Sequence, residues 1–264
     1  MKVLLCVNHE KEKSDEILDS VLSHLKRQCI VVTTESSEIS ICDLVMTVGG
    51  DGTILNWGKS AARARKPLLG INTGTLGFMA TLEPSELDKL SRLKSGDYRV
   101  SKRMMLDVIV EEKSFLALND AVISRETGAK LPEFRISGGG LEFSRIRADG
   151  LIFSTPTGST AYALSAGGPI LEPEISCIEF TPLCAHTLFG RTIIFSGEDA
   201  LNVTFSKYSD KDEVLLSVDG GERIRITGSQ AIEIKKSGLW LDIIDMSKNS
   251  FYDSVHNKLM RPLK

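Results

Sequence analysis

The stretch LVMTVGGDGT, residues 44–53, decides how the rest of the chain is interpreted. An apolar run leads into three glycines around one aspartate, and the helical pattern of residues 54–62 follows. This order predicts a buried strand whose carboxyl end opens into a phosphate-sized anion site at a helix N-terminus. Asp51 is unusual there, because helix N-terminal amides attract anions whereas a carboxylate repels a bare phosphate. The loop therefore needs a second role for Asp51, either a metal bridge or the activation of a hydroxyl.

A purely structural role is the alternative for Asp51, since aspartate is a common N-cap and a helix is expected from about Thr53 to Arg65. Gly49 and Gly50 favour function, because paired glycines cost backbone entropy unless something must approach closely. The loop follows neither common nucleotide cradle. No lysine completes a GxxxxGK[ST] motif, and Leu55 stands where GxGxxG requires its third glycine.

Strand and helix patterns alternate over residues 1–98. Strands are expected at residues 2–7, 30–33, 44–48 and 67–71, and helices at 14–26, 53–65 and 85–94. Alternation of this kind predicts a Rossmann-like parallel sheet with helices on its faces. A second glycine turn, NTGTLGF at residues 72–78, follows the strand at 67–71, so both glycine turns are expected at the carboxyl edge, where such sheets bind ligands.

Residues 99–244 have a different texture, with short alternating or β-branched segments separated by turns. Strands are expected at 105–111, 115–124, 133–136, 141–147, 151–154, 191–195, 201–205, 213–219, 222–226, 231–235 and 239–244. Glycine-rich hairpin turns are expected at 137–140 and 219–221. The fold class is therefore α/β plus all-β, the second domain being β-sandwich-like. A helix is possible at residues 250–260 of the C-terminal tail, residues 245–264, and the sequence leaves open whether the tail packs on the first domain.

Composition excludes several classes of protein. The formal charge of −3 argues against a nucleic-acid-binding face, and no stretch approaches the roughly 18 apolar residues of a membrane span or has the form of a signal peptide. The five cysteines are scattered and never form CxxC, as expected for reduced thiols in the cytoplasm. The four histidines are far apart, so no metal site built by the protein is expected.

The stretch TPTGSTAY, residues 155–162, interrupts the β-rich half and leads into a short helix of small residues closed by Gly167-Gly168-Pro169. Five of its eight residues carry a hydroxyl, and Gly158 allows close approach of backbone to a ligand. Uncharged groups of this kind suit recognition of ribose, phosphate or a base edge. A capped helix preceded by a turn is an equally good interpretation of the spacing alone.

Four motifs follow one another along the chain: GGDGT at 49–53, NTGTLGF at 72–78, LND at 118–120, and the DG at 149–150 that leads into TPTGSTAY. Together they resemble the motifs of the NAD kinase family. The resemblance covers most of the chain in the family's order. The first motif is shared with diacylglycerol, sphingosine and phosphofructokinase-type kinases, whereas the second and the last are much more specific. The resemblance implies an α/β domain and a β-rich domain with the active site between them, in a homodimer or homotetramer.

The implied reaction is phosphorylation of the adenosine-ribose 2′-hydroxyl of NAD by ATP or another phosphoryl donor, giving NADP. By this resemblance Asp51 orients and deprotonates the hydroxyl, while Gly50, Gly52 and Thr53 lie against phosphate. A divalent metal, Mg²⁺ above all, is expected to arrive bound to the phosphates, which answers the objection about repulsion at Asp51.

The resemblance also implies which residues hold the dinucleotide. Asn119 and Asp120 are expected to bind ribose hydroxyls, and Arg147 and Asp149 to meet the nicotinamide end. The residues expected to line the adenine pocket are Thr160, Ala161 and Tyr162, with Phe78, and with Ser165 close by.

Two other functions remain open from the sequence. A lipid or sugar kinase shares the glycine-aspartate turn, but the more specific motifs and the absence of a membrane-binding stretch argue against it. A sensor that binds NAD without turnover is disfavoured by Asp51, because a carboxylate facing phosphate weakens simple binding.

Overall fold

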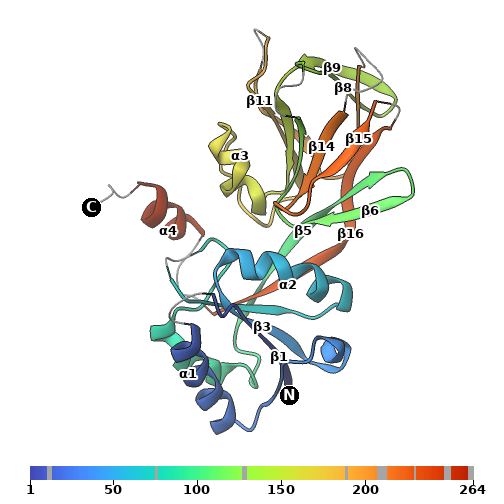
Figure 1. Cartoon of the computed structure of the whole chain (residues 1–264). Coiled ribbons are helices and arrows are strands. Elements are labelled where there is room, and N and C mark those ends of the chain that lie inside the picture. Colours follow the sequence, from blue (N-terminus) through green and yellow to red (C-terminus); the bar gives the residue numbers. More distant parts are fainter. Residues whose placement is uncertain are drawn as a thin grey trace. The chain divides into compact units, whose positions relative to one another are not determined.

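The computed structural model describes residues 1–10, 14–74, 77–126, 130–187, 190–206, 213–228, 230–246 and 251–260. The chain divides into two compact units (Figure 1). The first contains Met1–Arg103 and Trp240–Lys264, and the second contains Met104–Leu239. Within the described ranges, no helix has the length and apolar character needed to cross a membrane.

A parallel sheet forms the centre of the first unit. Its strands are, in spatial order, β2 (Val31–Thr33), β1 (Lys2–Val7), β3 (Leu44–Gly49) and β4 (Leu68–Asn72), and the C-terminal end of β16 (Ile232–Asp245) joins β4. The chain leaves β1 for β2 on one side and returns to β3 on the other side. Ligands bind at such a reversal, at the carboxyl ends of the strands, and GGDGT follows β3 there.

Helices cover both faces of this sheet. Side chains alternate along β4, so Leu69 and Ile71 share a core with α1 (Ser14–Arg27) and η2 (Pro84–Arg92). Gly70 points to the opposite face, where a Cβ would lie 2.5 Å from Ile54 of α2 (Asp51–Ala64). The remaining helical segments of this unit are η1 (Ser36–Ile41), α4 (Phe251–Val255) and η4 (His256–Met260).

The second unit is built from antiparallel strand pairs. One sheet has the order β12 (Ile193–Ser196), β11 (Cys177–Leu183), β10 (Gly150–Ser154), β7 (Asp120–Arg125), β14 (Glu213–Val218) and β15 (Ile224–Thr227). The other strands pair in the order β9 (Leu141–Arg147), β8 (Glu133–Gly138) and β13 (Ala200–Phe205), and β13 pairs with the first half of β16. Strand β5 (Arg99–Val110) pairs with β16 and with β6 (Lys113–Ala117). Two short helices, η3 (Thr157–Thr160) and α3 (Tyr162–Ser165), follow β10.

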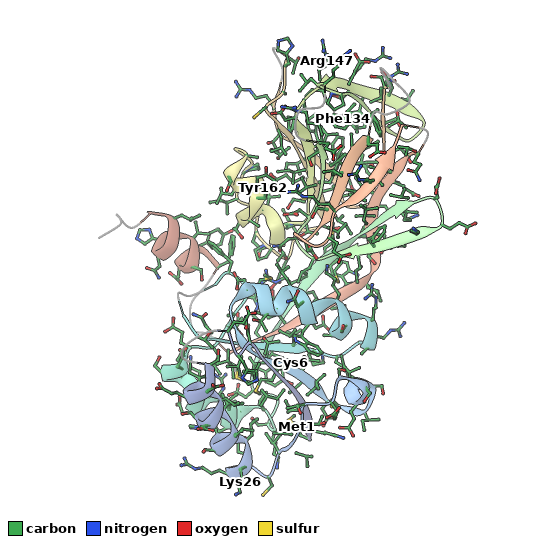
Figure 2. All side chains as sticks on the ribbon, viewed as in Figure 1. Met1, Cys6, Lys26, Phe134, Arg147 and Tyr162 are labelled. Atoms are coloured by element: carbon green, nitrogen blue, oxygen red, sulfur yellow. The ribbon has the colours of Figure 1, made fainter. Side chains whose placement is uncertain are left out.

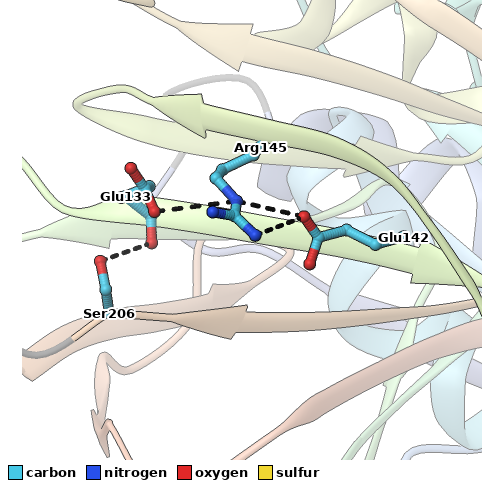
Figure 3. Close-up of polar contacts among 4 residues, drawn as sticks. All are labelled: Glu133, Glu142, Arg145 and Ser206. Carbon is cyan, nitrogen blue, oxygen red and sulfur yellow. Dashed lines mark hydrogen bonds and ion pairs between the residues drawn. The ribbon is translucent and has the colours of Figure 1, made fainter.

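The β8–β9 hairpin has the predicted glycine turn, in which Gly139 (φ 59°) and Gly140 (φ 83°) occupy the left-handed region. Close by, the Arg145 guanidinium lies between two carboxylates, 2.9 Å from Glu142 and 3.9 Å from Glu133 (Figure 3). The Ser206 hydroxyl donates to the Glu133 carbonyl at 3.3 Å. Arg145 and Glu142 are exposed and Glu133 is partly exposed, so the ion pairs add at most about 1 kcal/mol each.

The predicted fold class, α/β plus all-β, is confirmed, but the strands differ from their predictions in several places. The single strand expected over residues 115–124 is broken into β6 and β7, because the backbone N–H groups of residues 118–120 bond to a side chain instead of a strand. The two strands expected over residues 231–244 are one long strand, β16. Strand β11 was missed, because Glu179 and Pro182 interrupt its apolar pattern.

Candidate active site

Asp51 is the first residue of α2, and Gly50 rather than Asp51 is the N-cap. The N-cap alternative for Asp51 was therefore wrong. Its carboxylate instead bonds to the second glycine turn: the Phe78 N–H donates to Oδ2 at 2.7 Å, and the N–H groups of Met79 and Ala80 donate to Oδ1 at 3.1 and 3.3 Å. These bonds hold the carboxylate in one orientation at the open end of a helix.

The glycines of GGDGT have different roles. A Cβ on Gly49 would lie 2.2 Å from the Thr53 hydroxyl, so Gly49 is required by packing within the loop. A Cβ on Gly50 or on Gly52 would meet nothing within 4 Å. The first turn of a helix has N–H groups without intrahelical acceptors, so this open space beside Gly50 and Gly52 suits an approaching anion.

The second glycine turn is fixed by Asn72 and Gly77. The Asn72 amide donates to the Gly74 carbonyl at 2.8 Å and accepts from the Gly74 N–H at 3.4 Å, which forms a local turn after β4. A Cβ on Gly77 would lie 1.9 Å from Asp51 Oδ1. Only glycine therefore allows the turn to contact the carboxylate. Thr75 and Leu76 of the predicted motif lie outside the described residues.

In the second unit, Asn119 and the TPTGSTAY segment form one cluster. The Thr155 N–H and the Ser154 hydroxyl donate to the Asn119 carbonyl at 2.8 and 3.1 Å, and the Thr155 hydroxyl donates to the Leu118 carbonyl at 2.6 Å. A Cβ on Gly158 would lie 2.2 Å from the same Asn119 carbonyl oxygen. Glycine is thus what allows η3 to lie on the Asn119 backbone.

Asp219 is a functional candidate that the sequence does not predict, because the pattern at residues 219–221 indicates only a hairpin turn. Its carboxylate accepts three backbone N–H groups, from Leu118 at 3.0 Å, Asn119 at 2.7 Å and Asp120 at 3.1 Å. Asp219 has φ 50° and Gly220 has φ 68°, as a tight hairpin requires. An aspartate before two glycines is an ordinary turn signal, so nothing local in the sequence identifies this contact across 100 residues.

Residues 160–165 lie at the surface end of the same cluster. The Ala161 N–H donates to the Gly158 carbonyl at 2.8 Å, and the Thr160 hydroxyl reaches the Thr157 carbonyl at 3.4 Å. Tyr162 is 47% exposed and Ser165 is also exposed, whereas Asn119 and Asp120 are buried. Tyr162 is therefore not a core residue.

Arg147 and Asp149 lie at the opposite end of β10 from Thr155. Five residues of extended strand separate them, roughly 17 Å at 3.3 Å per residue, and Figure 2 shows Arg147 and Tyr162 well apart in this unit. Asp149 forms an ion pair with Arg125 at 2.7 Å. A ligand that contacts both groups within one chain must span the length of β10.

Buried polar atoms without a hydrogen-bond partner occur at the two glycine turns of the first unit and in the Asn119 cluster of the second. Among the described residues, four of the buried side-chain oxygens without a hydrogen-bond partner belong to Thr53, Thr73, Asn119 and Thr157. Burial of such atoms is costly unless a ligand or water completes them. Within the described part of the chain, no three His, Cys, Asp or Glu side chains are grouped to hold a metal ion.

Residues 6–98 match the model of the ATP-NAD kinase N-terminal domain, and residues 118–245 match that of the ATP-NAD kinase C-terminal domain. The chain belongs to the NAD kinase family. It is 32% identical to the NAD kinase of Clostridium beijerinckii over 276 residues, which cover 98% of this chain and 96% of the relative. The family resemblance and the enzyme class expected from the motifs are thereby confirmed.

Two solved structures have the same fold. The NAD kinase from Archaeoglobus fulgidus, in complex with ATP, is 26% identical with a TM-score of 0.78, covering 98% of this chain and 99% of that one. The yeast NADH kinase, complexed with NADH, has a TM-score of 0.84 at 23% identity, covering 100% of this chain and 90% of that one. The second likeness is one of fold alone.

Asp219→Ala in this kinase is expected to lower the free energy of unfolding by about 2 kcal/mol, because three N–H groups lose a charged acceptor. The KM for NAD should rise, since Asn119 and Asp120 lose their backbone support. Asp19→Ala, at an exposed position of α1, is the control. Urea unfolding and initial rates measure both effects. Wild-type values for Asp219→Ala would show that the contact supports neither the fold nor binding.

Proposed function

We propose that this enzyme transfers the γ-phosphoryl group of ATP, or the terminal phosphoryl group of another donor, to the 2′-hydroxyl of the adenosine ribose of NAD. The observation that carries the proposal is the Asp51 carboxylate, held by three backbone N–H groups beside the open space at Gly50 and Gly52. A carboxylate beside an anion site is explained by this reaction, because the acceptor hydroxyl must lose a proton there and the carboxylate can accept it.

Asp51 is the general base in this proposal. It accepts the proton of the 2′-hydroxyl as the oxygen attacks the phosphoryl group, an effect worth roughly 10²- to 10⁴-fold in rate. The hydrogen bond from the Phe78 N–H orients the carboxylate for that transfer. Gly50, Gly52 and Thr53 hold phosphate oxygens at the start of α2, where the helix dipole favours negative charge.

The second unit holds the dinucleotide. Asn119 and Asp120 bind ribose hydroxyls, and the unpartnered Asn119 Oδ1 accepts one of them. Thr160, Ala161 and Tyr162 line the adenine pocket together with Phe78, and Ser165 lies close by. The exposed face of Tyr162 is available for stacking on a base. Arg147 and Asp149 meet the nicotinamide end, if the dinucleotide extends along β10.

The phosphates bring a divalent metal, with Mg²⁺ as the proposed ion. When bound, the metal neutralises charge on the donor phosphates. The described residues fit this arrangement, because they offer amide and hydroxyl groups for phosphate. We further infer a homodimer or homotetramer, and a cytoplasmic setting, in which the five free cysteines remain reduced.

A panel of donors against acceptors tests the function. Purified enzyme is incubated with NAD, NADH, a diacylglycerol or a sugar, each with ATP, another nucleoside triphosphate or polyphosphate, and Mg²⁺. NADP should form from NAD with at least one donor. Phosphorylation of a lipid or sugar without any NADP would contradict the proposal, and NAD binding without turnover under every donor would indicate a sensor.

A further inference from the structure

Glu179 is a fully buried carboxylate in β11 that the proposed reaction does not use. Its side chain is 0% exposed, and one carboxylate oxygen, Oε2, has no hydrogen-bond partner among the described residues. The other oxygen accepts the Thr181 hydroxyl at 3.0 Å, and Thr181 in turn bonds to the Thr192 hydroxyl at 3.0 Å. A buried carboxylate with a single neutral hydrogen-bond donor is energetically unfavourable in its charged form. The presence of Glu179 at this position therefore needs an explanation.

The strand register places Glu179 on the same face of the sheet as Ser154 and Asp120. Glu179 is the cross-strand neighbour of Ser154 in β10, and Ser154 is the neighbour of Asp120 in β7. Directly opposed residues point to the same face of a sheet. Glu179 and Asp120 are therefore two strands apart, at roughly 10 Å, on one row of polar side chains.

The TPTGSTAY segment and the turn after α3 rest on this row through two glycines. A Cβ on Gly158 would lie 2.5 Å from the Ser154 hydroxyl, and a Cβ on Gly168 would lie 1.9 Å from Glu179 Oε1. The Cβ added at Gly168 would also lie 3.0 Å from the Ala163 carbonyl oxygen. That oxygen accepts the Gly168 N–H at 2.9 Å. The Glu179 carboxyl therefore supports the turn that ends α3.

We propose that Glu179 is a positioning residue for the dinucleotide, and that it supports the α3 turn in its protonated, neutral form. The inference rests on the proposed binding of NAD by residues 160–165. When Glu179 is ionised, a full negative charge lies beside the Ala163 carbonyl and the Gly168 backbone, and its one hydrogen-bond donor among the described residues, Thr181, is neutral. The turn then shifts to admit water, and the residues that bind adenine lose their position.

The surroundings of Glu179 agree with a neutral carboxyl at moderate pH. Burial raises the pKa of Glu179 from 4.5 to about 7, against the opposing effect of the hydrogen bond from Thr181. Of the groups that face it, Cys177 on the same strand is a neutral thiol, because burial and Glu179 raise its pKa to about 11. Ser154 of β10, Ile194 of β12 and Gly168 carry no charge, and Asp120 is two strands away.

The sign of the pH dependence follows from these values. Between pH 4.5 and about 7 the folded protein keeps a proton on Glu179 that the unfolded chain has released. Stability should therefore fall as pH rises through this range and level off above about 7. NAD binding should weaken as pH rises through about 7, because the neutral form binds.

The test measures the Kd for NAD of the full-length enzyme by calorimetry from pH 5.5 to 8.5, together with thermal unfolding without ligand. The wild type should bind NAD roughly fivefold more weakly at the alkaline end. Glu179→Gln, which mimics the neutral form, should bind NAD tightly with no such pH dependence. Glu142→Gln, at an exposed glutamate of β9, should keep the wild-type profile.

Thr181→Val provides a second test that does not alter the carboxyl itself. Loss of the Thr181 hydrogen bond removes an effect that lowers the pKa of Glu179, so the midpoint of the binding profile should move to higher pH. A pH-independent Kd in the wild type, or a wild-type profile in Glu179→Gln, would overturn the proposal. Failure to bind NAD at any pH would instead contradict the proposed function.

Discussion

Asp51→Asn is expected to reduce the rate of NADP formation by roughly 10²- to 10⁴-fold, because an amide cannot accept the proton of the 2′-hydroxyl. The substitution is nearly isosteric, and one oxygen remains to accept the Phe78 N–H. The amide nitrogen then faces the Met79 and Ala80 N–H groups, which lose their acceptor. A modest loss of stability is therefore expected beside the large loss of turnover.

The decisive comparison is between turnover, NAD affinity and stability in the same variant. Stopped assays give kcat, calorimetry gives the Kd for NAD, and thermal unfolding gives the melting temperature. Asp97→Asn is the control, since Asp97 is an exposed aspartate that pairs with Arg92 in the same unit. If Asp51→Asn lost NAD binding and stability in proportion to turnover, Asp51 would be an anchor of the second glycine turn and not the base.

Gly158→Ala is expected to lower the free energy of unfolding by about 3 kcal/mol. The new Cβ would lie 2.2 Å from the Asn119 carbonyl oxygen and 2.5 Å from the Ser154 hydroxyl. The carbonyl cannot retreat without weakening its bond to the Thr155 N–H at 2.8 Å. NAD binding should fall as well, because the shift displaces Asn119.

Gly238→Ala is the matched control for this effect. Gly238 lies in β16 of the same unit, and a Cβ there would meet nothing within 4 Å. Urea unfolding of both variants should show a large loss for Gly158→Ala and nearly wild-type stability for Gly238→Ala. Equal stabilities would contradict the packing of η3 on the Asn119 backbone.

The sequence predicted the fold class because local patterns carry it. Alternating strand and helix periods in the first hundred residues are independent of distant contacts, and so are the glycine turns at 139–140 and 220. Strand β11 escaped detection for the opposite reason. The Glu179 carboxylate lies against the α3 turn and Pro182 is paired with Leu151 of β10, and neither contact can be read from the local pattern of residues 177–183.

The sequence could name candidate residues for the site but not their contacts. A pattern of Gly-Gly-Asp-Gly cannot show that Gly49 makes room for Thr53 while Gly50 and Gly52 leave open space. Nor does it show that Asp51 bonds to Phe78, 27 residues away. Asp219 was missed for the same reason, because its partners lie about 100 residues earlier. Such contacts arise from tertiary structure, which local spacing does not encode.

The central claim, that this chain phosphorylates the 2′-hydroxyl of NAD with Asp51 as the base, is tested most directly by following the transferred phosphate. The enzyme is incubated with NAD, Mg²⁺ and ATP labelled at the γ-position, and the dinucleotide product is isolated and offered to an NADP-dependent dehydrogenase. We predict one label per product molecule, on the 2′-oxygen, with reduction by that dehydrogenase and almost no label with Asp51→Asn. Label on another oxygen, or undiminished labelling by Asp51→Asn, would contradict the claim.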